Sequence, residues 1–298
     1  MNAAPTTRPW AIVWVAVGAG LWGTDTLLRR PLTAAISSFQ IVLIEHLILT
    51  VVLLPVFWRV RAEWRALRPL QWAAVLAIAW GGSALGSICF TEAIKIGNPT
   101  AAVFLQKTQP LFTALLAGLL LHEPLTRRFW VCLLFALAGG YLVSFGDQPA
   151  VLTPTRASAA LLALSAAALW GASTVFGRFA LRGLSFFTLT TLRILCATPF
   201  LVALNWLGPS GMVTNFDGRQ AVSLLLMALI PGLAALLIYY HGLRHTRASL
   251  AALAELSFPV TATLLNWAFL GARIGPLQLA GFAVVWSVIL YLERSARA

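Results

Sequence analysis

The sequence predicts an all-α membrane protein in which ten transmembrane helices form two inverted five-helix repeats around a central cavity. Three observations predict this fold: the composition, ten long apolar segments and an internal repeat. Of the 298 residues, 60% are hydrophobic and 10% are charged, and the mean hydropathy is +0.86. A soluble domain carries roughly a quarter charged residues because its surface faces water. The composition therefore excludes an ordinary soluble fold.

The formal net charge is +12, which raises the question of nucleic-acid binding. The basic residues occur in short runs between apolar segments, which is the pattern of membrane-protein loops and not of a basic binding face. The sequence has no Gly-x-x-x-x-Gly-Lys-Ser/Thr phosphate loop. His241 and His245 have metal-compatible spacing but lack a third ligand nearby. We therefore expect no nucleic-acid partner, no cofactor and no metal site.

Ten segments are long enough to cross a bilayer, which takes about 20 mostly apolar residues. The connections between them are short, so neighbouring spans should run antiparallel. The first apolar run is too long for a usual signal-peptide core and is interpreted as the first span. The predicted spans are 10–28, 36–58, 70–94, 98–121, 128–146, 157–180, 185–206, 220–243, 247–270 and 276–293.

Lysine and arginine placement predicts the orientation of these spans. With a cytoplasmic N-terminus, thirteen basic residues lie on the inner side and six on the outer side. Cytoplasmic loops of membrane proteins carry the excess of basic residues. We therefore expect a multi-pass protein of the bacterial inner membrane with both termini in the cytoplasm.

An internal repeat divides the chain into residues 1–148 and 149–298. Leu21-Trp22-Gly23-Thr24-Asp25-Thr26 matches Leu169-Trp170-Gly171-Ala172-Ser173-Thr174 at an offset of 148. Phe90-x-x-Ala93-Ile94 matches Tyr239-x-x-Gly242-Leu243, and Pro110 matches Pro259, both at an offset of 149. Each repeat has five spans, an odd number, so the repeats must insert with opposite topology. Inverted repeats are typical of secondary transporters, which bind substrate where the two halves meet.

These motifs, with the Leu121-His122-Glu123-Pro124-Leu125 turn after the fourth span, resemble the ten-helix EamA-type branch of the drug/metabolite transporter superfamily. The resemblance covers essentially the whole chain. It implies that spans 1–4 and 6–9 surround the cavity and that spans 5 and 10 are peripheral. Within the family, the chain most resembles the YddG-type aromatic amino-acid exporters. The second repeat departs from the pattern, because Gly271-Ala272-Arg273 replaces the turn glutamate, so the two gates need not be equivalent.

Four ionisable residues lie well inside predicted spans, where a charge is costly unless it faces a cavity or a partner. Lys107 and Arg193 are candidates to bind a substrate carboxylate, and Glu45 and Glu255 are candidates to accept from an ammonium group. The alternative is that they pair with one another, Glu45 with Lys107 or Glu255 with Arg193, and fix the packing. Of the neighbours Glu45 and His46, we expect Glu45 to face inward.

Amide and aromatic side chains complete the predicted substrate site. Gln106 and Gln109 lie three residues apart on one face of span 4 and are too large to be explained as small packing residues. Trp22 and Trp170 lie deep in their spans beside glycine, and Tyr239 lies in span 8. An aromatic-walled cavity favours flat apolar groups or quaternary cations.

Pro110 and Pro259 occupy equivalent positions in spans 4 and 9. Each removes a backbone hydrogen bond and loosens its helix. We expect them to act as gating positions at which the helices bend during alternating access.

The sequence thus predicts a secondary transporter, not an enzyme. The expected substrates are small organic metabolites, most simply aromatic or other neutral amino acids, and export follows from the family resemblance alone. The expected partners are this substrate and the lipid bilayer, and we expect a functional monomer. The alternatives are a membrane-embedded enzyme, a channel, or a carrier of another substrate class.

Overall fold

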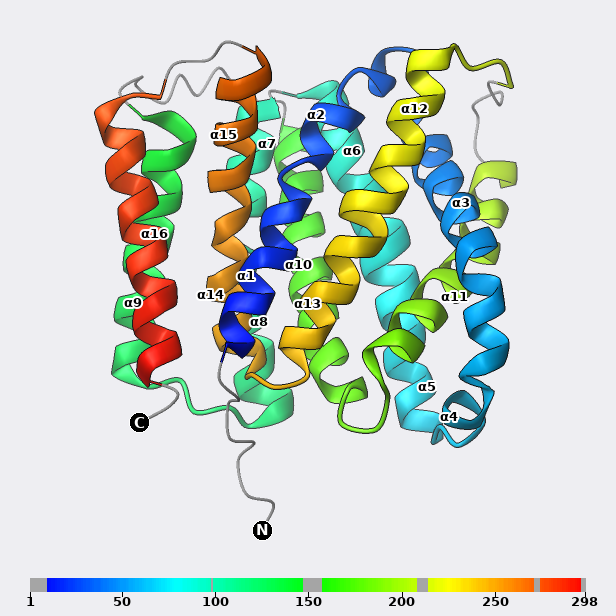
Figure 1. Ribbon diagram of the computed structural model, residues 1–298, viewed down its shortest axis with the longest axis horizontal. Coiled ribbons are helices and arrows are strands. Elements are labelled where there is room, and N and C mark those ends of the chain that lie inside the picture. The colour runs from blue at the N-terminus through cyan, green and yellow to red at the C-terminus, as the bar shows by residue number, and fades with distance from the viewer. Residues whose placement is uncertain (1–9, 98, 147–156, 208–213, 271–273, 296–298) are drawn as a thin grey trace.

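The computed structural model describes residues 10–97, 99–146, 157–207, 214–270 and 274–295 (Figure 1). Within these ranges the chain forms helices and no strand. Ten helical stretches are long and apolar enough to cross a bilayer, and their ends lie within a few residues of the predicted ones. They are Ala11–Arg29, Ser38–Arg59, Pro69–Ile96, Ala102–Leu121, Arg127–Phe145, Ala157–Ala180, Phe186–Leu207, Gly218–Leu243, Ala248–Phe269 and Pro276–Ser295.

Several of these spans are built from more than one helical segment. The first half of the chain consists of α1 (Ala11–Trp22), α2 (Asp25–Arg29), η1 (Leu32–Ala34), α3 (Ser38–Arg59), α4 (Arg61–Arg65), α5 (Pro69–Leu76), η2 (Ala77–Gly86), α6 (Ser87–Ile96), α7 (Pro99–Gln106), α8 (Gln109–Leu121) and α9 (Arg127–Phe145). The second half consists of α10 (Ala157–Ala180), α11 (Phe186–Leu207), α12 (Gly218–Met227), η3 (Ala228–Ala234), α13 (Ala235–Leu243), α14 (Ala248–Ala254), η4 (Glu255–Ser257), α15 (Phe258–Leu270) and α16 (Pro276–Ser295).

The two halves pack as inverted repeats. Helix α1 begins and α16 ends at the same end of the molecule, which is drawn at the bottom of Figure 1 and is called the lower end below. Helices α3 and α11, which are equivalent in the two repeats, pack against each other, and so do α9 and α16. Thr50 and Thr198, 148 positions apart, share a hydrogen bond of 2.8 Å between their hydroxyls. A contact between equivalent residues places the pseudo-two-fold axis close to this pair.

The repeated Trp-Gly motif has a packing role in each half. A Cβ on Gly23 would lie 2.8 Å from the backbone N of Ala262 in α15, and a Cβ on Gly171 would lie 3.1 Å from the backbone N of Thr113 in α8. Ala262 and Thr113 are themselves 149 positions apart. A side chain at position 23 would therefore clash with the backbone of α15, and one at position 171 would be in tighter than ordinary contact with α8, because equivalent helices approach closely at both glycines.

Spans 4 and 9 are broken where the sequence predicts bends. Span 4 is interrupted at Lys107 and Thr108 between α7 and α8, and span 9 passes through the 3-10 turn η4. Pro110 and Pro259 are the second residues of the helices that follow these breaks. A proline ring clashes with the carbonyl four residues earlier and cannot donate to it. The residues in conflict are Gln106 and Glu255, so each helix is interrupted directly before its proline.

Spans 3 and 8 contain π-helical segments in equivalent places, η2 and η3. Pro231 lies inside η3 and lacks the N–H that a regular helix needs there. In η2 the carbonyl of Gly82 accepts a hydrogen bond of 2.8 Å from the indole of Trp170. A side-chain donor at a helix carbonyl interrupts the regular ladder. The two widened turns therefore have different local causes.

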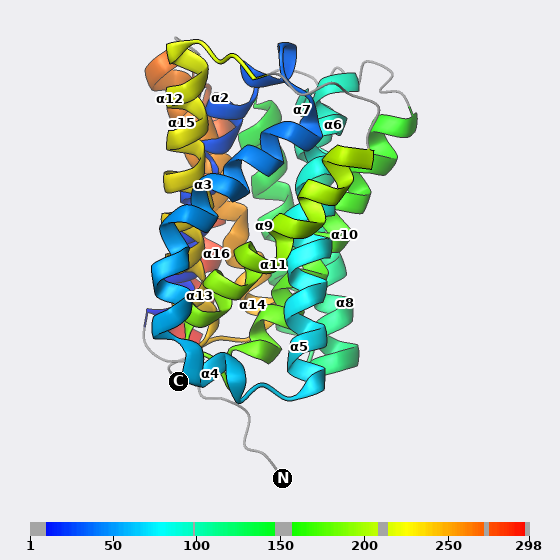
Figure 2. The same ribbon diagram turned by 90° about the vertical axis from the view of Figure 1, so that its right-hand side faces the viewer.

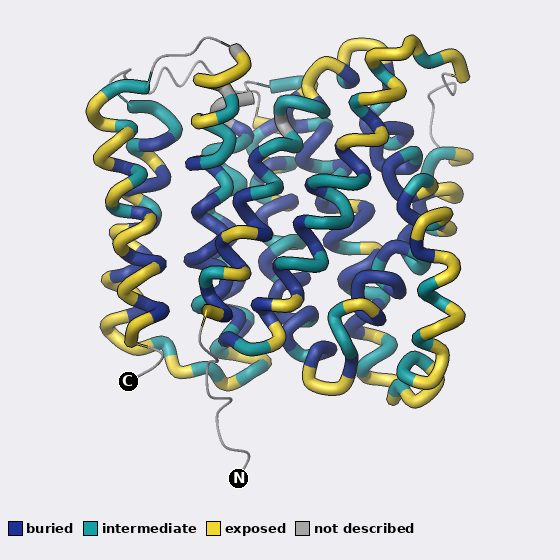
Figure 3. Tube along the Cα trace, viewed as in Figure 1, coloured by how far each residue is buried: buried dark blue, intermediate teal, exposed yellow. Residues whose placement is uncertain are grey.

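Helices α9 and α16 lie together at one edge of the molecule (Figures 1 and 2). They approach closely at Gly139 and Gly281, where a Cβ on either glycine would lie within 3.2 Å of the other's carbonyl oxygen. Exposed residues follow the outer faces of α16 and α3, while the interior is buried (Figure 3). Many exposed side chains are apolar, among them Val51, Leu119 and Leu134. Such a surface suits contact with lipid.

Candidate substrate cavity

A cavity with an empty volume of about 1240 Å³, including space open to solvent, lies between the two repeats. Both repeats line it, and in the described part of the chain neither α9 nor α16 contributes a residue. The lining residues are Trp22, Asp25, Arg29, Glu45, His46, Leu49, Ser83, Ser87, Phe90, Gln106, Lys107, Gln109, Pro110, Trp170, Ser173, Thr174, Arg193, Ile194, Pro231, Gly232, Leu236, Tyr239, Tyr240, Glu255, Leu256, Phe258 and Pro259.

Every residue predicted for the site lines this cavity. The predicted substrate-binding residues found there are Trp22, Glu45, Gln106, Lys107, Gln109, Trp170, Arg193, Tyr239 and Glu255, and the predicted gating residues are Pro110 and Pro259. The structure thus brings together side chains that are up to 237 positions apart in the sequence (Trp22 and Pro259). Their roles in binding and gating remain predictions.

Glu255 joins the two repeats through neutral donors. Its Oε1 accepts hydrogen bonds from the hydroxyls of Tyr239, at 2.5 Å, and Thr174, at 3.1 Å. Its Oε2 accepts from the amide of Gln109, and the Oε1 of Gln109 accepts in turn from Gln106 at 2.8 Å. The predicted alternative, a pair with Arg193, does not form. Three donors already occupy the Glu255 carboxylate, so it has little remaining capacity for a substrate ammonium group.

Lys107 lies at the break between α7 and α8 and is 5% exposed. Its Nζ has no hydrogen-bond partner among the described residues and lies 5.0 Å from the centre of the Phe258 ring. The predicted alternative, a pair with Glu45, does not form. A buried ammonium group over an aromatic face retains its donors for another ligand. Of the three lysine and arginine side chains lining the cavity, Lys107 is therefore the one whose charged group has no hydrogen-bond partner at all among the described residues.

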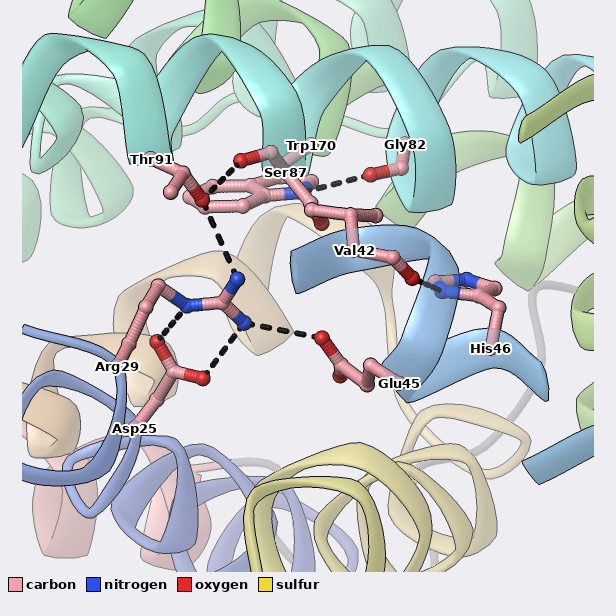
Figure 4. Close-up of polar contacts among 9 residues, drawn as sticks. All are labelled: Asp25, Arg29, Val42, Glu45, His46, Gly82, Ser87, Thr91 and Trp170. Atoms are coloured by element: carbon pink, nitrogen blue, oxygen red, sulfur yellow. Dashed lines mark hydrogen bonds and ion pairs between the residues drawn. The ribbon is translucent and has the colours of Figure 1, made fainter. Parts of the chain in front are cut away.

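Glu45 is paired with Arg29, a residue that the sequence analysis placed outside the first span (Figure 4). Arg29 Nη2 lies 3.1 Å from Glu45, and Nε and Nη2 donate to Asp25 at 2.7 and 2.8 Å. Arg29 Nη1 also donates to the hydroxyl of Thr91 at 3.2 Å. Arg29 is buried because α2 extends the first span to this residue. The spacing of four residues between Asp25 and Arg29 on a helix was the signal in the sequence for the ion pair between those two residues.

Arg193, the second predicted cation, is held within the protein. Its Nε donates to the hydroxyl of Ser83, its Nη1 donates to the hydroxyl of Tyr240 at 2.9 Å, and its guanidinium lies 5.9 Å from the centre of the Tyr240 ring. Ser83 belongs to the first repeat and Tyr240 to the second, so Arg193 also ties the halves together.

His46 borders the cavity as well as Glu45, contrary to the expectation that only one of them faces inward. The Nδ1 of His46 lies 2.9 Å from the carbonyl oxygen of Val42, one turn earlier in α3 (Figure 4). Neighbouring residues on a helix point about 100° apart. The cavity is wide enough at α3 to be bordered by both side chains.

Two equivalent aromatic pairs stand in the cavity wall. Trp22 and Tyr239 have ring centres 4.8 Å apart, and Trp170 and Phe90 have ring centres 5.2 Å apart. Trp22 is equivalent to Trp170, and Phe90 is equivalent to Tyr239. Each pair therefore contains one residue from each repeat. Trp80 and Trp267, by contrast, are 43% and 55% exposed and do not line the cavity.

A group of buried apolar side chains, called the lower plug below, packs the two repeats together near the lower end. Its members belong to one continuous core cluster and each is at most 2% exposed. They are Val75, Ile78, Leu181, Leu184, Leu189 and Leu243. The first two belong to the first repeat and the others to the second, so the plug seals the interface between the repeats.

Comparison with known proteins agrees with this arrangement. The model of the EamA-like transporter family matches residues 9–145 and again residues 157–292. The chain belongs to the EamA-like transporter family. The two matches fall on the two halves of this EamA-like chain, in agreement with the two-repeat fold.

Two bacterial relatives of this EamA-like protein are named as transporters. It is 30% identical to the riboflavin transporter ImpX of Fusobacterium nucleatum, over 94% of this chain and 96% of that protein. It is 24% identical to the uncharacterized transporter YwfM of Bacillus subtilis, over 74% of this chain and 75% of that protein. The chain is thus a transporter and not an enzyme. These relatives support neither amino-acid export nor the narrower YddG-type resemblance.

A solved crystal structure has the same fold. It superposes with a TM-score of 0.76 at 18% sequence identity and covers 97% of this chain and 99% of that chain. At this identity the likeness bears on the fold alone. It supports the overall fold described above.

Proposed function

We propose that this EamA-like protein is a secondary carrier for a flat heteroaromatic metabolite of the riboflavin class. One observation carries the proposal: the cavity offers aromatic faces and a buried lysine without a hydrogen-bond partner among the described residues, while both of its buried glutamates already have donors. We further propose that the protein works as a monomer in the bacterial inner membrane, by alternating access, with residues 1–148 and 149–298 as the two moving repeats.

The aromatic pairs favour a flat substrate. Trp22 with Tyr239 and Trp170 with Phe90 present rings on opposite sides of the pseudo-two-fold axis. Aromatic side chains bind planar ring systems by offset stacking and edge-to-face contact, and each such contact contributes about 0.5–1.5 kcal/mol beyond area burial. A fused heteroaromatic ring has enough surface to use more than one of these walls.

The polar groups favour a substrate that accepts hydrogen bonds. Lys107 has donors available, and Gln106, Ser87 and Ser173 also line the cavity. An isoalloxazine ring carries carbonyl oxygens and ring nitrogens that accept hydrogen bonds, and the ribityl chain of riboflavin carries hydroxyls. The named substrate of the relative ImpX therefore has the chemistry that this cavity would recognise.

A neutral amino acid is the second candidate, and Lys107 is the observation that favours it, because a free ammonium group suits a carboxylate. The same substrate also requires an acceptor for its own ammonium group. Glu45 is paired with Arg29, and Glu255 is occupied by three donors. We therefore rank amino acids below an acceptor-rich heteroaromatic substrate.

The test is a substrate panel on the purified protein. Riboflavin fluorescence should fall on binding, because a flavin stacked on an indole is quenched. Proteoliposomes loaded with riboflavin should then accumulate labelled riboflavin by counterflow, with and without an imposed pH gradient. Saturable counterflow distinguishes a carrier from a channel.

Tryptophan and phenylalanine serve as competing substrates in the same assay. Trp22→Leu should reduce quenching, whereas Trp206→Leu should not, because Trp206 is 88% exposed and lies outside the cavity. Counterflow of tryptophan without any of riboflavin would transfer the proposal to amino acids. Absence of counterflow for both classes would remove both candidates.

A further inference from the structure

Two glutamates of the first repeat bind it to the second repeat at the lower end, where Glu293 of the second repeat also accepts from the backbone N of Ile12 at 3.2 Å. Glu123 follows α8 in the Leu121-His122-Glu123-Pro124-Leu125 turn, and Glu63 lies in α4 between spans 2 and 3. Both belong to the first repeat. Their hydrogen-bond acceptors are directed at backbone N–H groups where spans of the second repeat begin.

Glu123 uses both carboxylate oxygens in this contact. Its Oε1 accepts from the backbone N of Ala248 at 2.8 Å, and its Oε2 accepts from the backbone N and the hydroxyl of Ser249 at 3.0 and 2.6 Å. The first N–H groups of a helix have no partner within the helix. A carboxylate is a strong acceptor for them because the hydrogen bonds are charge-assisted. Three such bonds connect the end of span 4 to the start of span 9.

Glu63 makes the corresponding contact on the other side of the molecule. Its Oε2 accepts from the backbone N of Ser185 at 2.7 Å, directly before α11. The lower plug lies at the same end, and Leu184 of the plug is adjacent to Ser185 in the sequence. Both carboxylates thus hold second-repeat residues against first-repeat segments at the end of the molecule where the lower plug lies.

The two ends of the molecule differ in this respect. At an offset of 149, the residue equivalent to Glu123 is Ala272, which has no acceptor in its side chain and lies outside the described residues. At the upper end, the carboxylate of Glu92 accepts from Ser38 at 2.7 Å, and the network of Arg29 joins α2, α3 and α6. Those contacts stay within the first repeat. The described hydrogen bonds that join the repeats at the upper end come from neutral side chains, among them the amides of Asn205, which donates to the carbonyl of Phe39, and Gln278, which donates to the carbonyl of Val143, both at 3.1 Å.

We propose that Glu123 and Glu63 form a lower latch, which stabilises the conformation in which the lower end is closed and must release before the cavity can open there. The proposal rests on alternating access but not on the identity of the substrate. Glu123 and Glu63 are positioning residues: they lie outside the cavity lining and act on the equilibrium between the two access states. Because its bonds are charge-assisted and the described upper-end bonds between the repeats come from neutral side chains, the latch biases the resting protein towards a closed lower end.

The test measures opening of the lower end without any substrate. A cysteine reporter replaces Ala248, which is fully buried and packs with Ala117 of α8 and Val175 of α10. Cys89, Cys132 and Cys196 are replaced by serine in the full-length protein. The rate of reaction of the reporter with a charged methanethiosulfonate is measured in nanodiscs. Glu123→Gln should raise this rate about tenfold, as expected when charge-assisted hydrogen bonds are weakened, and Glu63→Gln should raise it further in the double variant.

Glu92→Gln is the matched control, because it alters a glutamate whose described bond lies within one repeat at the upper end. It should leave the rate unchanged. Ser249→Ala removes one of the three bonds and should give a smaller rise, which covers the case in which Glu123→Gln does not fold. Equal rates in Glu123→Gln, Ser249→Ala and Glu92→Gln would overturn the latch. Because this measurement uses no substrate, that result would not contradict the proposed transport of a riboflavin-class substrate, which the counterflow assay tests separately.

Discussion

Lys107 shows how one side chain can define what a cavity recognises. It is buried over Phe258 with its donors unused in the described structure. Lys107→Met should weaken substrate binding roughly tenfold to hundredfold, the effect of losing a hydrogen bond to a charged group. Lys107→Arg should retain part of the affinity because it keeps the charge. Fluorescence titration of the purified variants measures this.

Lys95→Met is the matched control for that titration, because Lys95 is exposed outside the cavity and loses the same charge. If Lys107→Met bound the substrate as tightly as Lys95→Met did, the acceptor group of the substrate would have to lie elsewhere in the cavity.

Glu255 is the better of the two candidate carboxylates for proton coupling. Glu45 has a cationic partner in Arg29, whereas the described partners of Glu255 are neutral. A carboxylate held by neutral donors can exchange a proton without breaking an ion pair. In proteoliposomes, Glu255→Gln should flatten the pH dependence of transport, and Glu45→Gln should alter it less. Identical pH profiles in the wild type and Glu255→Gln would indicate a facilitated carrier.

The sequence identified the residues of the cavity better than their partners. A charge inside an apolar span is costly unless it faces a cavity or a partner. Position in the sequence alone therefore identifies four residues as candidates for the cavity, which are Glu45, Lys107, Arg193 and Glu255. Pairing depends on the reach of long side chains between helices, which spacing does not determine. For this reason neither of the two pairs considered as the alternative to substrate binding forms in the structure. Arg29 was missed because it stands at the end of its span, where a basic residue usually faces the loop.

Among the elements, spans 4 and 9 carry the clearest consequence for motion. Each is broken directly before a proline, and Lys107 and Glu255 lie in the breaks. Alanine at position 110 or 259 restores an N–H and favours a continuous helix. Pro110→Ala and Pro259→Ala should therefore slow counterflow several-fold while leaving substrate affinity within about twofold, if helix bending limits the conformational step.

Pro55→Ala is the control for those two variants, because Pro55 lies inside α3 on an exposed face. If Pro110→Ala and Pro259→Ala turned over as fast as Pro55→Ala, the helix breaks would not contribute to the conformational step of transport.

The sequence predicted loosened helices at Pro110 and Pro259, and the structure shows a two-residue break before Pro110 and a 3-10 turn before Pro259. Proline removes one backbone hydrogen bond from any helix. Whether the helix only bends or is also interrupted depends on which other groups donate to the carbonyl oxygens that are left without a partner. The π-helical segment η2 was not predictable, because Gly82 accepts its bond from Trp170, a residue 88 positions away. Local pattern contains no information on such a donor.

For the whole molecule, the basic residues predict the side on which each loop lies. Arg61 lies at the lower end and Arg219 near the start of span 8 at the upper end, and both are exposed. Placed singly in a cysteine-free background, Arg219→Cys should react with an impermeant maleimide in intact spheroplasts, and Arg61→Cys should react only after permeabilisation. The reverse pattern would invert the proposed orientation.

Composition, span length and the repeat were sufficient to predict the ten-helix inverted fold, because hydrocarbon imposes the same constraints on every span. The substrate was not predictable in the same way. The argument for an amino acid needed Glu45 and Glu255 to be free, and their occupancy follows from Arg29, Gln109, Thr174 and Tyr239 once the chain is folded.

The bond between Thr50 and Thr198 has a consequence for the energetics of the carrier. If each repeat adopts the conformation of the other when the carrier changes from inward-open to outward-open, a contact between two equivalent residues is the same in both forms. Such a bond stabilises both forms equally, so its loss would lower the overall stability and leave the ratio of the two forms unchanged. Glu123 has no such counterpart, and only asymmetric contacts of that kind can set which way an empty carrier faces.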